Sequence, residues 1–158
     1  MAIRNIVNEK EDILKKKSRD VENFDLKLHI LLDDMIETMK KADGIGLAAV
    51  QVGILRKVIV INEDNENDNI IELINPVIIE TSGEQESVEG CLSCPGNYGI
   101  TKRPMRVIVK AKDRFGKEFI KAGEGLLAKA FCHEIDHLNG ILFYDHVIRP
   151  YEPEKEEE

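Results

Sequence analysis

The sequence lacks any apolar stretch long enough to cross a bilayer, and its first residues lack the hydrophobic segment of a signal peptide. We therefore expect a cytoplasmic protein whose thiols stay reduced. Tryptophan is absent and cysteine is scarce: the three cysteines are an odd number and offer no disulfide framework. In a reducing compartment, cysteine spacing points instead to metal binding or catalysis.

The sequence is also poor in positive charge. Its 22 Lys and Arg residues face 30 Asp and Glu residues, which gives a formal net charge of -8. This balance argues against non-specific attraction to nucleic acid or to an anionic membrane. Much of the negative charge falls in residues 63–68 and 152–158, and such runs are typical of a solvated loop and tail. The length suits one domain with a substantial core.

The first long periodic segment predicts a helix. Apolar residues recur at helical spacing from Asp25, a candidate N-cap, to Lys41. Asp43-Gly44 is a candidate stop for this helix. Residues 44–53 are small, apolar and too rich in glycine for a stable helix. Such a stretch allows the backbone to come close to another segment or to a ligand.

Strands are expected between this helix and a second one. Short β-branched or alternating segments occupy residues 57–62, 70–74, 77–80, 106–112 and 118–121. Asn75-Pro76 should separate two of these strands. The second helix should begin near Glu124 and end at Asn139-Gly140. Because the strands cluster between the helices, we expect an α+β fold, with mostly antiparallel sheets packed around a buried C-terminal helix and with an N-terminal helix.

The second helix carries the sequence HEIDH, from His133 to His137. Two histidines four residues apart lie one turn from each other, so both imidazoles can reach a single ion. Glu134 projects near the open side of such an ion and can take a proton from its bound water, as in the HExxH metallohydrolases. The alternative is a histidine pair without function, on the surface or near the helix C-terminus, where the helix dipole favours histidine.

A third ligand decides between these interpretations, and residues 89–96 offer Cys91 and Cys94. One cysteine with the two histidines would leave an open position for water. Both cysteines would instead complete a closed Cys2His2 structural zinc site. The gap between the two pairs is longer than in compact zinc modules, and a chain with this much core does not need a metal to fold. Pro95 and Gly96 indicate a loop here, which disfavours a redox Cys-x-x-Cys.

At this point the sequence resembles a known family. The peptide deformylases remove the formyl group from the N-terminal methionine of new bacterial and organellar proteins. Their patterns G-x-G-L-A-A-x-Q, E-G-C-L-S and H-E-x-D-H are similar to residues 44–51, 89–93 and 133–137. The three motifs occur in the family's order and at similar separations. The resemblance covers the chain from the first helix to Phe143, and it implies a metal-dependent hydrolase of N-terminal methionine processing.

The resemblance implies roles for the motif residues. Cys91, His133 and His137 would bind the metal, with water as fourth ligand. Metal-bound hydroxide would attack the formyl carbon, with Glu134 as general base and then as the acid that protonates the leaving amine. The family's native metal is usually ferrous iron, for which nickel, cobalt or zinc can substitute. A thiolate with two imidazoles suits zinc as readily as iron.

The same resemblance assigns the glycine-rich motif and the residue after the cysteine. Gln51 and the backbone N–H of Leu92 would stabilise the oxyanion formed on the formyl carbon. Gly44 and Gly46 would let the backbone pair with the substrate peptide like an added strand.

Charged residues around the motifs are expected to support the ligands. Glu89 should anchor the segment that carries the cysteine, with Arg103 as its ion-pair partner or, alternatively, as half of a surface pair. Asp136 could orient a ligand or join a surface ion pair. Cys132 and Cys94 depart from the family pattern, which usually has Gln and an aliphatic residue there. Cys94 so near the other cysteine offers a route to an oxidative disulfide.

The resemblance further implies one catalytic domain over residues 1–150 and an acidic, disordered tail over residues 151–158. The partners would be N-formylmethionyl nascent chains near the ribosome, with no membrane and no specific nucleic acid. The acidic tail would be repelled by RNA phosphate and would not dock to the ribosome.

The residues alone leave two other functions open. One is an HExxH peptidase whose third ligand lies downstream, at Asp145, His146 or the tail. The other is a non-catalytic protein with a structural Cys/His zinc site.

Overall fold

The structure is a computed structural model that describes residues 2–63 and 69–151. Most of the acidic runs predicted as a loop and a tail lie outside these residues. The helices are α1 (Leu26–Lys41) and α2 (Leu126–Leu138), with the short 3-10 helices η1 (Asp12–Lys15), η2 (Ala49–Val52) and η3 (Phe143–His146). The strands are β1 (Gly46–Ala48), β2 (Val58–Asn62), β3 (Ile70–Ser82), β4 (Gln85–Cys91), β5 (Cys94–Arg103), β6 (Arg106–Lys112), β7 (Glu118–Glu124) and β8 (Val147–Pro150).

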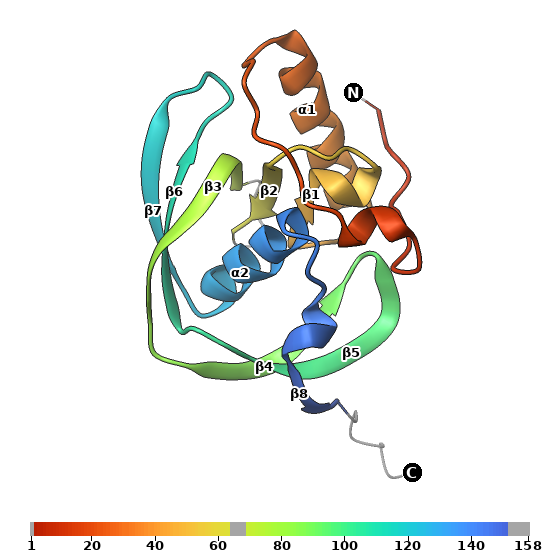
Figure 1. The fold of residues 1–158 in the computed structure, drawn as a ribbon, viewed down its shortest axis with the longest axis vertical. Helices are drawn as coiled ribbons and strands as arrows, with labels where there is room; N and C mark the ends of the chain where they lie inside the picture. Colours follow the sequence, from red (N-terminus) through yellow and green to blue (C-terminus); the bar gives the residue numbers. More distant parts are fainter. Residues whose placement is uncertain (1, 64–68, 152–158) are drawn as a thin grey trace.

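The strands form two sheets, of order β1-β2-β3-β6-β7 and β4-β5-β8. Every pair of neighbouring strands within these sheets is antiparallel. Figure 1 shows α2 in the middle of the molecule, between the larger sheet and the smaller one, with α1 at the far end from the smaller sheet. The predicted α+β fold, with antiparallel sheets around a buried C-terminal helix, is confirmed.

The larger sheet is covered on both faces, and β2 shows why its sequence is apolar throughout. Val58 and Val60 belong to the core that contains the buried side chains of α1. Ile59 and Ile61 belong to the core that contains α2. Because successive side chains of a strand point to opposite faces, both helices press on the same strand from opposite sides. The arrangement holds α2 rigidly against the sheet.

Both helices begin and end close to the predicted residues. The Asp25 side chain accepts a hydrogen bond from the backbone N–H of Leu28 at 3.1 Å, which caps α1. Asp43, two residues after the end of α1, has φ = 56°. Helix α2 starts at Leu126 rather than at the predicted Glu124, and Gly140 follows it with φ = 74°. No helix in the described part of the chain is long and apolar enough to cross a membrane.

The predicted break at Asn75-Pro76 is wrong, because β3 runs through it. The register between β3 and β6 shifts there, so the two residues form a bulge within one strand. Asn75 takes φ = 52°. Its side-chain amide accepts a hydrogen bond from the N–H of Val21 at 2.8 Å and donates one to the carbonyl of Val21 at 3.0 Å. These contacts with a distant residue hold the strand together at Asn75-Pro76, where the local sequence alone predicts that the strand ends.

The prediction of a loop at Pro95 and Gly96 is also wrong. Both residues lie in β5, which pairs with β4 as a hairpin whose turn is Leu92-Ser93. Proline is tolerated in a strand at a bulge, at an edge or near the strand start, and Pro95 is the second residue of β5. The hairpin carries Cys91 at the end of β4, so a sheet rather than a loop positions this thiol.

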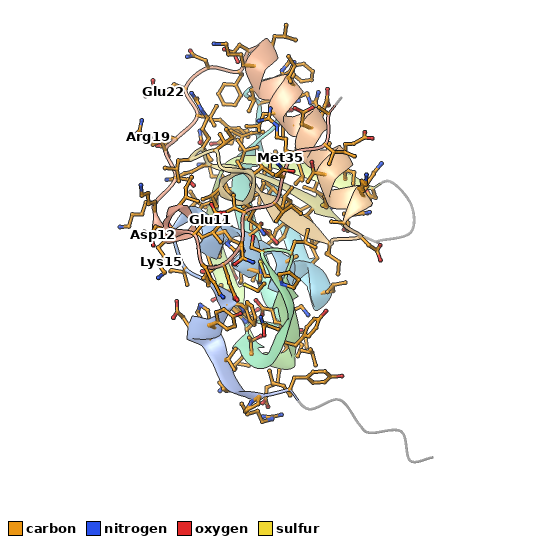
Figure 2. The ribbon with its side chains drawn as sticks, turned by 90° about the vertical axis from the view of Figure 1, so that its right-hand side faces the viewer. Glu11, Asp12, Lys15, Arg19, Glu22 and Met35 are labelled. Atoms are coloured by element: carbon orange, nitrogen blue, oxygen red, sulfur yellow. The ribbon has the colours of Figure 1, made fainter. Side chains whose placement is uncertain are left out.

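The segment before α1 wraps around one side of the molecule. In Figure 2 its charged side chains follow that side, whereas Met35 of α1 lies inside. The labelled charged residues are Glu11, Asp12, Lys15, Arg19 and Glu22. The N–H of Ser18 donates to the carbonyl of Leu138 at 2.8 Å. A side chain on Gly140 would meet the carbonyl oxygen of Lys15 at 2.4 Å. The segment therefore packs tightly on the C-terminal end of α2.

Candidate active site

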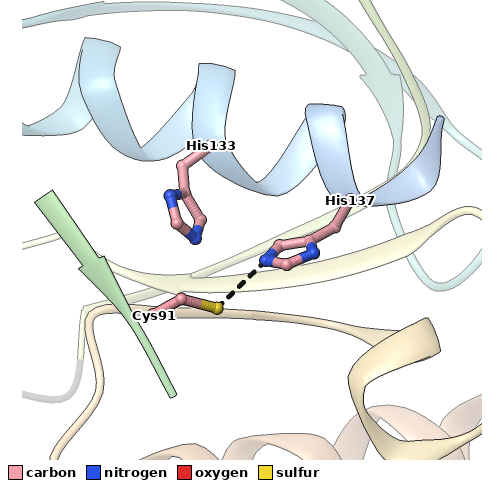
Figure 3. Close-up of side chains that lie close together, drawn as sticks. All are labelled: Cys91, His133 and His137. Carbon is pink, nitrogen blue, oxygen red and sulfur yellow. Dashed lines mark hydrogen bonds between the residues drawn. The ribbon is translucent and has the colours of Figure 1, made fainter. Parts of the chain in front are cut away.

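Three side chains converge between β4 and α2. Cys91 ends β4, and His133 and His137 lie one turn apart on α2. Their ligand atoms all lie within 4.8 Å of one another. Figure 3 shows both imidazoles turned toward the thiol, with Nε2 of His137 at 3.2 Å from Sγ of Cys91. This is the donor set of a site with three protein ligands and an open position.

No other described histidine, cysteine or carboxylate belongs to this group. Cys94 pairs with Cys91 across the hairpin but is not part of the cluster. His146, the downstream ligand that an HExxH peptidase could use, lies instead with its Nε2 at 3.0 Å from Oδ2 of Asp136. The geometry therefore favours neither a closed Cys2His2 site nor a downstream third ligand.

The hydrogen bonds around the cluster fit a metal ion. Nδ1 of His133 lies 2.5 Å from Oε1 of Glu89, so its N–H donates to the carboxylate and Nε2 stays free for an ion. His137 presents its Nε2 to the thiol. Among the described residues, Nδ1 of His137 and Oε1 of Glu134 are buried without a hydrogen-bond partner. Buried polar atoms are rarely left so, and an ion with its bound water would account for the glutamate.

Beneath the histidines lies a buried network centred on Glu89. Its carboxylate accepts hydrogen bonds from Thr101 at 2.6 Å and from Nη2 of Arg103 at 2.6 Å. Nη1 of the same arginine reaches Asp136 at 2.7 Å. Burial alone would raise the pKa of Glu89, but the hydrogen bonds from His133 and Arg103 outweigh it and hold that pKa well below the usual value. Glu89 is therefore an ionised carboxylate with every partner in place.

Glu134 has the opposite surroundings. It is buried beside the cluster, and burial raises its pKa to about 7. Burial, together with the charge of His133, lowers the pKa of His137 to about 3, so that imidazole is neutral and could bind a metal ion. A carboxyl group that can exchange its proton near neutral pH is suited to general acid–base chemistry.

Gln51 is fixed on the other side of Cys91. Its Oε1 accepts from the N–H of Ala48 at 2.9 Å, which defines the orientation of the amide. Its Nε2 donates to Sγ of Cys91 at 3.4 Å and to the hydroxyl of Ser93 at 3.3 Å. Gln51 is 1% exposed. The amide thus holds an N–H donor beside the Cys91 thiol.

A cleft of about 430 Å³ opens onto the cluster. β1 lines it on one side and β4 on the other, and each is an edge strand of its sheet. A side chain on Gly46 would meet Oε2 of Glu134 at 2.6 Å, and one on Gly44 would meet Leu92 at 2.6 Å. The apolar part of the lining includes Ile45, Val88, Leu92, Leu126 and Ala130. The size suits a small ligand, and the two free strand edges suit an extended peptide.

Two residues of this site were not found from the sequence. Thr101 donates to Glu89, but a threonine on a strand carries no signal of such a role. Lys129 lines the cleft and donates to the carbonyl of Val88 at 3.0 Å. It lies one turn before His133, so the helical spacing could have placed it on the face of the metal ligands.

The chain matches the family model for polypeptide deformylase over residues 3–152. The chain belongs to the peptide deformylase family. A peptide deformylase of Caldicellulosiruptor bescii is 55% identical over 149 residues, which cover 94% of this chain and 88% of the relative. One from Alkaliphilus metalliredigens is 56% identical and covers 94% and 99% of the two chains.

Solved structures give the same result. A crystal structure of a peptide deformylase from Legionella pneumophila has a TM-score of 0.90 at 46% identity and covers 92% of this chain and 86% of that one. A Synechococcus elongatus peptide deformylase, solved in complex with actinonin, has a TM-score of 0.88 at 41% identity and covers 91% and 80%. The chain is accordingly a metal-dependent hydrolase of the family that removes the N-terminal formyl group from nascent polypeptides. A peptidase and a structural zinc protein are not favoured.

Proposed function

We propose that Cys91, His133 and His137 bind one divalent metal ion and that Glu134 carries the proton transfers of deformylation. The observation that carries the proposal is the convergence of the three ligand atoms beside a buried carboxylate without a partner. Ferrous iron is the metal we propose for the native protein, with Ni²⁺, Co²⁺ or Zn²⁺ as substitutes. The thiolate and the imidazoles are donors that all of these ions accept.

A divalent ion bound there would polarise the formyl carbonyl and lower the pKa of a bound water toward about 7. Glu134 would take up the proton of the attacking water and later deliver it to the nitrogen of the leaving amine. Its burial matters because it brings the pKa of the carboxyl close to neutral, where one group can serve as both base and acid. Glu89, ionised and tied to Arg103, holds His133 in the tautomer that leaves Nε2 free.

Gln51 and the backbone N–H of Leu92 are proposed to stabilise the negative charge that develops on the formyl oxygen. The carboxamide of Gln51 is pre-oriented by Ala48, so it needs no rearrangement during the reaction. Leu92 directly follows Cys91 and lines the cleft. Both donors therefore lie next to the thiolate ligand.

We propose that the substrate peptide binds between the free edges of β1 and β4. Because Gly46 has no side chain, the Glu134 carboxylate fits against it. In the same way, Gly44 makes room for the Leu92 side chain. An extended peptide can then pair with strand backbone, and apolar side chains of the cleft can receive the methionine.

The remaining parts of the proposal concern the setting of the reaction. Residues 1–150 act as a single catalytic domain, and the predicted acidic tail lies, from residue 152 on, outside the described residues. The protein works in the cytoplasm on N-formylmethionyl nascent chains close to the ribosome, without docking through that tail and without binding a membrane or a specific nucleic acid. The net charge of -8 supports the last two points.

The experiment is formate release from formyl-Met-Ala-Ser by protein purified without oxygen and loaded with ferrous iron or nickel. We expect turnover that stops on chelation and returns when the metal is restored. One tightly bound metal per chain without any turnover would contradict the proposal.

A further inference from the structure

The Cys-x-x-Cys motif contains a thiol that the metal site does not use. Cys91 closes β4 and Cys94 opens β5, and the two are directly opposite partners across a two-residue turn. Opposite residues of an antiparallel pair have Cα atoms about 4.5–5.5 Å apart, and disulfides join residues whose Cα atoms lie about 4.4–6.8 Å apart. The two thiols lie within hydrogen-bonding reach of each other. The hairpin therefore presents the pair for bond formation without movement of the backbone.

The two thiols differ in access. Cys91 lines the cleft and is partly exposed. Cys94 is 0% exposed, so a small oxidant that enters the cleft meets Cys91 first. Cys132, the third cysteine, is buried in α2 and belongs to the apolar core. It is a natural control because it is free, buried and next to a metal ligand in the sequence.

The N-terminal segment fastens the turn from outside. The N–H of Glu9 donates to the carbonyl of Ser93 at 2.8 Å. The Glu9 carboxylate and the Tyr144 hydroxyl are hydrogen-bonded to each other, and both contact the thiol of Cys94. These contacts hold the Cys94 side chain in place beside Cys91.

We propose that Cys91 and Cys94 are a peroxide-sensitive pair, in which Cys94 rescues the metal ligand from irreversible oxidation. A peroxide oxidises the Cys91 thiolate: one peroxide oxygen is transferred to sulfur, which becomes a sulfenic acid, and the other leaves as hydroxide. The sulfur of Cys94 then attacks that of Cys91, and the sulfenic oxygen leaves as water with the thiol proton. In sum, one thiolate, one thiol and one hydrogen peroxide give one disulfide, one water and one hydroxide.

The disulfide would also switch the enzyme off. A disulfide sulfur carries no negative charge and is a poor ligand compared with a thiolate, so the ion would keep only the two imidazoles and dissociate. A dithiol such as dithiothreitol would regenerate both thiols, and the site could then be reloaded. Both the thiolate form of Cys91 and this loss of the ion rest on the proposed role of Cys91 as a metal ligand, whereas the placement of the two sulfurs opposite each other does not.

The test uses the nickel-loaded full chain, because ferrous iron itself reacts with peroxide. The protein, Cys94→Ser and Cys132→Ser are treated with hydrogen peroxide, and metal content, free thiols and peptide masses are measured. We expect the parent and Cys132→Ser to lose one metal and two thiols per chain and to yield a peptide lighter by two hydrogen atoms. Dithiothreitol followed by nickel should restore turnover in both. In Cys94→Ser we expect Cys91 to gain two or three oxygen atoms and turnover to stay lost.

Three results would overturn the inference. The parent could accumulate the same irreversible oxygen adducts on Cys91 as Cys94→Ser, or its disulfide could join Cys132, or its thiols could survive while the variant is oxidised. A Cys91–Cys94 disulfide with full retention of nickel would mean something different. It would leave the pair intact and overturn the assignment of Cys91 as a metal ligand.

Discussion

Glu89 and Glu134 are two buried carboxylates of one site, and they lie in opposite surroundings. Glu89 is 3% exposed and is bonded to Thr101, Arg103 and His133. Glu134 is 5% exposed, and its Oε1 has no partner among the described residues. The first therefore stays charged and positions a ligand, whereas the pKa of the second rises to about 7. Both carboxylates are buried, so burial alone does not bring a carboxyl pKa close to neutral. Burial has that effect on Glu134 because its carboxylate lacks the hydrogen bonds that keep Glu89 ionised.

The largest structural effect should come from Glu89→Gln. It removes the negative charge from a pair in which both side chains are 3% exposed and leaves the Arg103 guanidinium buried without its main partner. Such a loss typically costs about 3–5 kcal/mol, which lowers the melting temperature by on the order of 10 °C. Thermal unfolding of the metal-loaded variant measures it.

Glu84→Gln is the matched control, because it removes the charge of an exposed pair with Lys102. Exposed pairs contribute little, so its melting temperature should equal that of the parent. Equal melting temperatures for Glu89→Gln and Glu84→Gln would break the distinction between the buried network and the surface.

Gly46→Ala should act on Glu134 alone. The added methyl would lie 2.6 Å from Oε2 of Glu134, so the carboxylate must move. A displacement of about 1 Å can cost on the order of a hundred-fold in rate. We expect kcat for a formylated peptide to fall by that order while metal content stays at one per chain.

Gly44→Ala serves as the comparison for that variant, because its methyl would meet the Leu92 side chain, at 2.6 Å from Cδ1, instead of Glu134. It should lose less kcat than Gly46→Ala. The reverse order would show that the position of Glu134 is not what Gly46 protects.

Among the substitutions within the site, the smallest effect should come from Asp136→Asn. This side chain is 20% exposed and bonds Arg103 at 2.7 Å, so water partly screens the pair. Asparagine keeps an acceptor for the arginine, and we expect a loss of about 1 kcal/mol in the free energy of unfolding. Urea unfolding should resolve it, and a loss as large as that of Glu89→Gln would place the centre of the network at Asp136 instead.

The sequence was sufficient for the fold class, for both helices and for the convergence of Cys91, His133 and His137. Both helices have apolar residues at helical spacing, and this periodicity shows which side of a helix faces the core. The three motifs were sufficient to indicate the family. Predictions from local sequence patterns were wrong where contacts with distant residues determine the backbone conformation. Hydrogen bonds between Val21 and Asn75 hold β3 as one continuous strand across the proline. Pro95 and Gly96 predict a loop when judged alone, but both lie in β5, which pairs with β4.

The opposite states of Glu89 and Glu134 could not be predicted from the sequence. The pairing of Glu89 with Arg103 was one of two alternatives, and the choice depends on burial. Thr101 and Lys129 entered only with the structure, since neither a strand threonine nor a helical lysine signals a site. Motifs predict which side chains lie together in the site. Which hydrogen bonds each side chain makes or lacks depends on how the elements pack, and the motifs do not show this.

The most direct test of the account is turnover of Glu134→Gln, with metal content measured on the same sample. The substitution keeps the shape of the side chain and removes its ability to take up a proton. We predict one metal per chain, as in the parent, and a kcat lower by on the order of a hundred- to ten-thousand-fold. Turnover at the parent's rate with the metal in place would show that Glu134 does not carry the proton, and would contradict the account.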